Sequence, residues 1–231
     1  MQEISVTSAR LKAEEILNAV THGIGTALAV AALTGMLIYY WQEGVWHLTS
    51  CLVYGISLVV LYLASTLYHS FSNERWKAIF KFIDHAAIYI VIAGSYTPFT
   101  LIPLRGDLGW SIFAVVWILA AAGILFQFFF VKRFRILGTL CYLGMGWFAL
   151  VMVRPLLELL PVDAIYWLLY GGAFYTVGAI FYLIKKIPYN HAIWHLFVLA
   201  GSAAHFVAIF KFVLPLPESV RMLTSMALSF Y

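Results

Sequence analysis

Seven apolar stretches, each of 18 residues or more, run through this sequence. Of the 24 charged residues, only Lys211 lies inside one of them. A bilayer core about 30 Å thick is crossed by roughly 20 helical residues, and a charge at its centre costs at least about 2.5 to 3.5 kcal/mol. We therefore predict an all-α, polytopic membrane protein with a seven-transmembrane-helix bundle. The predicted spans are residues 19–41, 46–68, 86–104, 110–131, 136–153, 164–184 and 192–214.

The composition excludes a disordered chain, a collagen-like repeat and an ordinary cytosolic fold. Charged residues make up 10% of the chain and apolar residues 64%, whereas soluble domains contain about 25% charged residues. The formal net charge of +4 comes from basic residues spread over short connections, which suits anionic lipid headgroups rather than a nucleic-acid surface. We expect membrane lipids as partners and no nucleic acid.

The basic residues of the connections predict the orientation of the chain, because cytoplasmic loops carry an excess of Lys and Arg. With the N-terminus inside, ten basic residues lie on the cytoplasmic side and four on the outer side. We therefore predict a cytoplasmic N-terminus, retained without cleavage, and an outer C-terminus. The ten are Arg10, Lys12, Arg75, Lys77, Lys81, Lys132, Arg133, Arg135, Lys185 and Lys186, and the four are Arg105, Arg154, Lys211 and Arg221.

We expect residues 1–231 to form one domain, because the connections are short and no linker divides the chain. The longest predicted loop covers residues 70–82. Cys51 and Cys141 fall in opposite leaflets of the predicted bundle, which excludes a disulfide between them, and we interpret both as unpaired packing residues. The tail, residues 215–231, receives no interpretation.

Six ionisable side chains gather at the predicted cytoplasmic ends of four spans. A single histidine at a helix end is more often interfacial or structural, but joint placement at one membrane face favours a shared functional role. His47 stands apart at the outer face, and we interpret it as solvated. The six side chains are His22, His69, Asp84, His85, His191 and His195.

Two of these histidines have the spacing of a metal-binding pair. His191 and His195 are four residues apart, which places them about 40° apart on one helix face, where both can bind one ion. The pair lacks the glutamate that follows the first histidine in metalloproteases, and Asp84 is the acidic residue placed to act as a base. Three histidines with an open fourth position form a catalytic type of zinc site.

Other polar residues share a helix face with one of these histidines. Ser65 lies four residues before His69, and Glu15, Asn18 and His22 form one stripe leading into the first span. We interpret Glu15 and Asn18 as caps or as groups that support the ligands. His205 lies about 15 Å beyond His195 along the helix, where we interpret it as a hydrogen-bonding packing residue that can line a cavity.

Together these motifs resemble those of a known family. Glu15-x-x-Asn18-x-x-x-His22, Ser65-x-x-x-His69 followed by Asp84, and His191-x-x-x-His195 resemble the three motifs of the progestin and adipoQ receptor family, and the chain looks most like its bacterial branch, the hemolysin III proteins. This family is also grouped with the alkaline ceramidases. The resemblance covers about residues 13–213.

The resemblance implies a zinc ion (Zn²⁺) near the cytoplasmic leaflet of a bacterial inner membrane. His69, His191 and His195 would be its ligands, Asp84 would hold the zinc-bound water, and Ser65 would support the site. Glu15, Asn18, His22 and His205 are then candidates for side chains around the ligands.

Three functions remain open at this point. The first is a zinc-dependent hydrolase of a lipid amide or ester, as in the ceramide hydrolysis associated with related receptors. The second is a non-enzymatic receptor or membrane-homeostasis protein with a structural zinc. The third is a pore-forming cytolysin, as the name hemolysin suggests, although the polar groups gather at one end of the predicted bundle.

Overall fold

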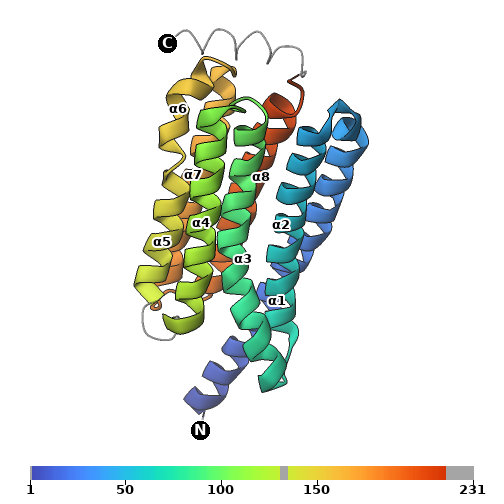
Figure 1. The fold of residues 1–231 in the computed structure, drawn as a ribbon. Helices are drawn as coiled ribbons and strands as arrows, with labels where there is room; N and C mark the ends of the chain where they lie inside the picture. Colours follow the sequence, from blue (N-terminus) through green and yellow to red (C-terminus); the bar gives the residue numbers. More distant parts are fainter. Residues whose placement is uncertain (1, 131–134, 217–231) are drawn as a thin grey trace.

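The chain folds into a bundle of long helices in a computed structural model, which describes residues 2–130 and 135–216 (Figure 1). Within these residues there is no strand, and seven helices are long and apolar enough to cross a membrane. The predicted fold class is therefore confirmed. The helices are α1 (Gln2–Tyr40), α2 (Val45–Ser70), α3 (Glu74–Leu101), α4 (Asp107–Phe130), α5 (Arg135–Trp147), α6 (Leu150–Leu157), α7 (Val162–Leu183) and α8 (Asn190–Ala208), with a short 3-10 helix η1 (Trp41–Glu43) and a π-helix η2 (Ile209–Val213).

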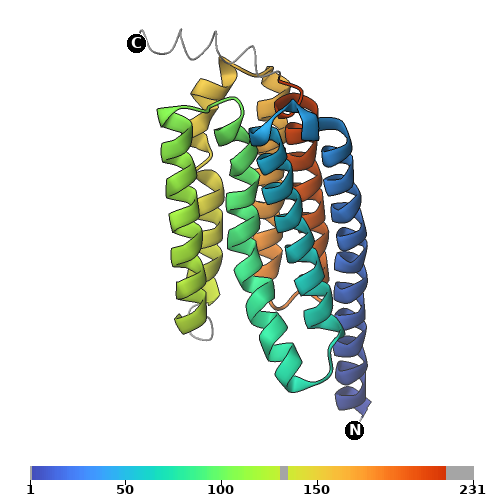
Figure 2. The ribbon, with the colours of Figure 1, turned by 45° about the vertical axis from the view of Figure 1, so that its right-hand side comes forward.

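Packing between neighbouring helices places the last long helix against the first. α1 packs along α2, α2 along α3, α3 along α4, and α7 along α8. α8 also packs against α1, so the last long helix returns to the first. The start of α1, the turn between α2 and α3, and the connection from α7 to α8 consequently lie at the same end of the bundle (Figures 1 and 2).

The long helix α3 begins well before the predicted third span. Asn73 caps it by accepting hydrogen bonds from the backbone N–H groups of Arg75 (3.0 Å) and Trp76 (3.3 Å). The prediction of a loop over residues 70–82 is therefore wrong, because hydropathy detects only the apolar part of a helix that continues as a capped, polar extension. Asp84 consequently lies inside α3 rather than at its entry.

The predicted fifth span is broken into two helices. α5 ends at Trp147 and α6 begins at Leu150, and the Tyr96 hydroxyl donates to the carbonyl oxygens of Met145 (2.7 Å) and Gly146 (2.9 Å) beside the break. A hydroxyl donor next to irregular backbone compensates for lost helical hydrogen bonds inside a membrane. The break is therefore stabilised by a side chain of α3, and hydropathy alone does not reveal this contact.

Several smaller expectations are also settled by the fold. Both cysteines are free, and Cys51 is buried as expected, but Cys141 is exposed on the outer surface of the bundle and is not a packing residue. His47 is only 1% exposed, so its interpretation as solvated is wrong. It shares a helix face with the buried residues Cys51 and Tyr54, and that face turns toward the bundle.

Some of the basic residues that predict the orientation lie outside the described residues. Lys132, Arg133 and Arg221, like most of the tail 215–231, belong to the segments that the structure does not describe. The starts of α1 and α3 and the end of α7, which carry or adjoin seven of the other basic residues counted as cytoplasmic, share one end of the bundle (Figure 1). The cytoplasmic N-terminus stays a prediction from this charge bias.

Candidate metal centre

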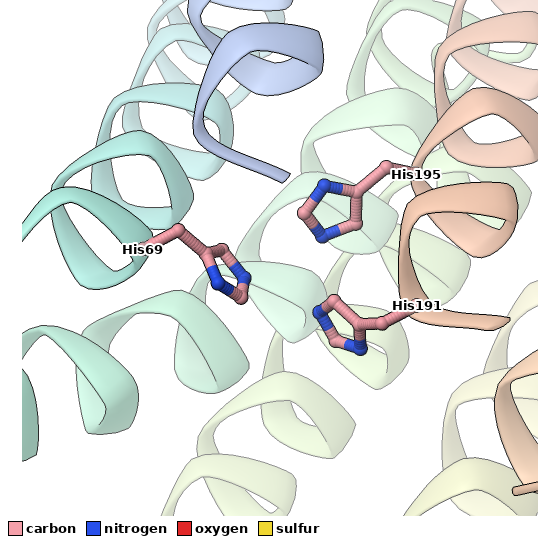
Figure 3. A group of neighbouring side chains, drawn as sticks. All are labelled: His69, His191 and His195. Carbon is pink, nitrogen blue, oxygen red and sulfur yellow. The ribbon is translucent and has the colours of Figure 1, made fainter. Parts of the chain in front are cut away.

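Three histidines from two helices meet at the end of the bundle where α1 and α3 begin and α7 ends. His69 lies in the last turn of α2, while His191 and His195 lie in the first turns of α8 (Figure 3). One ring nitrogen from each lies within 4.8 Å of those of the other two. These are the three residues that the resemblance implied as ligands, and the structure brings them together in what we call the histidine triad.

The start of α8 is held in place from two sides. The Asn190 side-chain amide donates to the carbonyl oxygens of Phe181 (3.2 Å) and Tyr182 (3.1 Å) at the end of α7. On the other side, the Glu14 carboxylate accepts a hydrogen bond from the backbone N–H of His191 (3.2 Å). A carboxylate is favourable at a helix N-terminus because the N–H groups there carry partial positive charge. The helix that supplies two of the three imidazoles is thus fixed to both α7 and α1.

The ring of His69 is oriented by a carboxylate on α1. Its Nδ1 lies 2.8 Å from Glu15 Oε2, and Glu15 Oε1 lies 3.1 Å from Lys77 Nζ. Because an ionised carboxylate only accepts hydrogen bonds, Nδ1 carries the proton and Nε2 carries the lone pair. This Nε2 is buried without a hydrogen-bond partner in the described structure. Histidine ligands of metals usually donate their other N–H to a carboxylate in this way.

The ring of His195 is oriented by a hydroxyl, again on α1. Its Nδ1 lies 3.3 Å from Thr21 Oγ1, which itself donates to the carbonyl oxygen of Leu17 (2.8 Å). Since the Thr21 proton is already used, Thr21 accepts from His195 and leaves the lone pair of that ring on Nε2. Thr21 was not among the predicted site residues, although it follows Asn18 by three residues and so falls on the same stripe of α1.

The triad fits a divalent metal ion in both chemistry and protonation. His191 Nε2, like His69 Nε2, is buried without a partner in the described structure, and such atoms are destabilising unless something binds them. Three neutral imidazole nitrogens suit zinc. His69, His191 and His195 would hold such an ion, which would act there as a Lewis acid.

Asp84 and Ser65 lie near the triad without bonding to it. Asp84 is buried, and its Oδ2 lies 3.3 Å from His85 Nδ1. It lines the same cavity as His191 and His195. Ser65 lies one turn before His69, fully buried, and its hydroxyl has no partner in the described part of the chain. Asp84 is thus placed toward the cavity, whereas Ser65 is buried beside the triad and is not one of the residues that line the cavity.

His22 lies directly against the triad. Its ring stacks on that of His195, with centroids 3.5 Å apart and planes 9° apart, and meets the edge of the Tyr62 ring. It is buried, and neither ring nitrogen has a partner within the described structure. The expectation that it borders the site therefore agrees with its position, as it does for Asn18, whose side-chain nitrogen lies 3.5 Å from His69 Nδ1.

His205 does not join the triad. Its Nε2 lies 3.2 Å from the carbonyl oxygen of Leu168 on α7, and its ring covers Gly171, where a Cβ atom would collide with it. This agrees with its interpretation as a packing residue that lines the cavity.

An apolar cavity of about 150 Å³ opens beside the triad inside the bundle. Asp84, His191 and His195 lie on its wall, which otherwise consists mostly of aliphatic and aromatic side chains. Cavities of this kind, mostly apolar with a small number of polar groups, are typical of sites for apolar ligands.

The fold and the triad define a polytopic membrane protein with a candidate metal centre at one end of its helix bundle. The family model described as "Haemolysin-III related" matches residues 11–206. The chain belongs to this family, as its motifs predicted.

Its similarity to individual proteins extends over most of the chain. It is 50% identical to "Hemolysin-3" of Bacillus cereus over 203 residues, which cover 87% of this chain and 93% of that protein. It is 48% identical to "Hemolysin-3 homolog" of Bacillus subtilis (strain 168) over 205 residues, 88% of this chain and 96% of the relative. A human protein, "Monocyte to macrophage differentiation factor", is 30% identical over 207 residues, 87% of this chain and 84% of its own length.

Proposed function

We propose that this protein is a zinc-dependent hydrolase that cleaves an amide or ester bond of a membrane lipid. The observation that carries the proposal is the histidine triad at the end of an apolar cavity, in which Nε2 of His69 and Nε2 of His191 are buried without a partner in the described structure. His69, His191 and His195 would hold the ion. Zinc bound there would supply Lewis acidity toward a carbonyl oxygen and lower the pKa of water.

The chain's own residues have separate roles in this proposal. Glu15 and Thr21 fix the rings of His69 and His195, so the ligands are preorganised. The apolar wall of the cavity receives an acyl chain and excludes bulk water. Asp84 is the acidic side chain on the wall of this cavity, and we assign it the proton of the attacking water, which it passes to the leaving amine or alcohol.

Substitution of Asp84 tests this function. Asp84→Asn keeps the shape of the side chain but removes the base, so turnover of lipid amides and esters should fall by about 10² to 10⁴ while bound zinc is unchanged. Product is measured by mass spectrometry on purified, zinc-loaded protein, and zinc by elemental analysis. Asp107→Asn is the matched control, because Asp107 is an exposed acid at the start of α4. Undiminished hydrolysis by Asp84→Asn contradicts the mechanism.

The same measurements separate the hydrolase from a protein with a structural metal. If wild-type, zinc-loaded protein forms no product from a broad panel of lipid amides and esters, the hydrolase is rejected. A lower thermal stability on zinc removal would then favour a receptor or membrane-homeostasis protein.

A further inference from the structure

A second group of polar side chains faces the cavity, far from the triad. Tyr54 of α2, Tyr175 of α7 and His205 of α8 all line it, and we call them the inner polar cluster. The rings of Tyr175 and His205 lie 5.5 Å apart between centroids, and Tyr54 lies close to Tyr175. Because His205 follows His195 by ten residues, His205 lies about 15 Å along α8 from the triad.

The hydrogen bonds that His205 and Tyr175 already make determine which donors and acceptors of this cluster remain for a ligand. His205 Nε2 lies 3.2 Å from the Leu168 carbonyl oxygen, which only accepts, so this nitrogen carries the proton and Nδ1 is a free acceptor. The Tyr175 hydroxyl lies 2.9 Å from Ser202 Oγ, which also accepts from the Tyr62 hydroxyl at 2.7 Å. Tyr175 is therefore held in position by a bond outside the cavity.

Tyr54 provides the unsatisfied donor. Its side chain is 1% exposed, and its hydroxyl has no hydrogen-bond partner in the described structure. A buried hydroxyl without a partner is destabilising, and Tyr54 is one of the residues that line the cavity. The cluster thus offers one O–H donor and one nitrogen acceptor to whatever occupies this end.

The wall between the triad and the cluster is apolar. Leu58 and Leu61 of α2 and Val198 of α8 lie between the two polar places along their helices and line the cavity. A ligand that reaches both places therefore needs an apolar segment with a polar group at each end of it. A hydroxyl matches the inner cluster, because it donates and accepts at once, whereas a ketone only accepts.

We propose that the cavity selects lipids whose acyl chain carries a hydroxyl on the order of a dozen carbons from the carboxyl carbon. In an extended chain each C–C bond of about 1.5 Å advances the zigzag by about 1.3 Å, so about a dozen carbons span the roughly 15 Å between the triad and His205. The hydroxyl accepts from Tyr54 and donates to His205 Nδ1. This inference rests on the proposed function, because it places the carboxyl carbon at the triad.

Binding of fatty acids, which cannot be hydrolysed, tests the proposal without turnover. The probes are 12-hydroxyoctadecanoic, 2-hydroxyoctadecanoic and octadecanoic acid, measured by displacement of radiolabelled octadecanoic acid from zinc-loaded protein in nanodiscs, with empty nanodiscs as the blank. We expect the 12-hydroxy acid to bind about tenfold more tightly than the other two. Equal affinities for all three acids overturn the proposal.

Two tyrosine variants provide a matched comparison. Tyr54→Phe removes only the unpaired hydroxyl, so the preference should fall to about twofold or less. The hydroxyl of Tyr89 is also buried without a partner in the described structure, but Tyr89 does not line the cavity, so Tyr89→Phe should keep the tenfold preference. A preference that survives Tyr54→Phe, or is lost in Tyr89→Phe, contradicts the assignment.

Hydrolysis of lipid amides is measured on the same preparations. A hydroxyl preference without hydrolysis rejects the proposed enzyme and keeps the selectivity of the cavity. Hydrolysis without the preference rejects only the inner cluster as a specificity determinant.

Discussion

At the scale of single residues, the triad is defined as much by its neighbours as by its histidines. Glu15 and Thr21 each occupy one nitrogen of a ring and so direct the lone pair of the other. Both lie on α1, which contributes no histidine to the triad itself. The affinity for a metal should therefore depend on a helix that does not bind it.

Replacement of Glu15 tests this dependence. Glu15→Gln removes the negative charge that orients and polarises His69, and we expect zinc affinity to fall by about 10- to 100-fold. Affinity is measured by competition with a zinc chelator of known strength. Glu43→Gln, at an exposed acid of η1, should leave affinity unchanged. Equal zinc affinity in Glu15→Gln and wild-type protein contradicts the assignment of Glu15.

Zinc content of purified variants distinguishes the triad from His205, which lies farther along α8. The double variant His191→Ala/His195→Ala removes two of the three ligands, so purified protein should contain almost no zinc. His205→Asn removes a histidine of α8 that stands apart from the triad, so its zinc content should match wild type. The outcome that contradicts the site is zinc loss in His205→Asn, or full zinc content in the double variant.

At the scale of elements, close contact between α7 and α8 positions two ligands. Gly178 of α7 faces Phe197 and Trp194 of α8, and a Cβ atom at this glycine would lie 2.6 Å from the Phe197 Cβ. Trp194 directly precedes His195 in the chain. Small residues allow such close helix approach in membranes, so this glycine supports the position of the triad indirectly.

A pair of glycine variants measures that support. Gly178→Ala forces the two helices apart and should destabilise the protein by about 1 to 3 kcal/mol, seen as a lower thermal midpoint in detergent and weaker zinc binding. Gly144→Ala is the control, because Gly144 of α5 has open space around it, and alanine there should be neutral or stabilising by up to about 1 kcal/mol. Equal destabilisation by both changes would show that the α7–α8 contact is not special.

At the scale of the whole molecule, the excess of basic residues at one end predicts how the bundle sits in the membrane. We expect a fluorescent reporter fused before Met1 to be active in the cytoplasm, and a reporter that requires export to be active only after Tyr231. Expression in a bacterial cell with separated membrane fractions also tests the predicted inner-membrane location. Reversed reporter activities would place the triad at the outer face.

Much of this protein could be predicted from local sequence. Apolar spans of 18 residues or more that hold at most one charge indicate membrane helices, and the spacing of His191 and His195 places them on one face in any helix. These properties depend only on neighbours along the chain. Helix ends were predicted less well, as at α3, because Asn73 extends a helix through polar residues that hydropathy does not detect.

The amino-acid sequence by itself determined the membrane class, the seven helices and the pairing of His191 with His195, because hydrophobicity and helical spacing are local. The resemblance of its motifs to a family added His69 as the third candidate ligand. Only the tertiary structure decided which nitrogen of His69 and of His195 is unused, since that depends on Glu15 and Thr21 of another helix. It also decided that Tyr54 and His205 face one cavity. Contacts between distant segments arise from the packing of whole helix faces, and no short stretch of sequence specifies them.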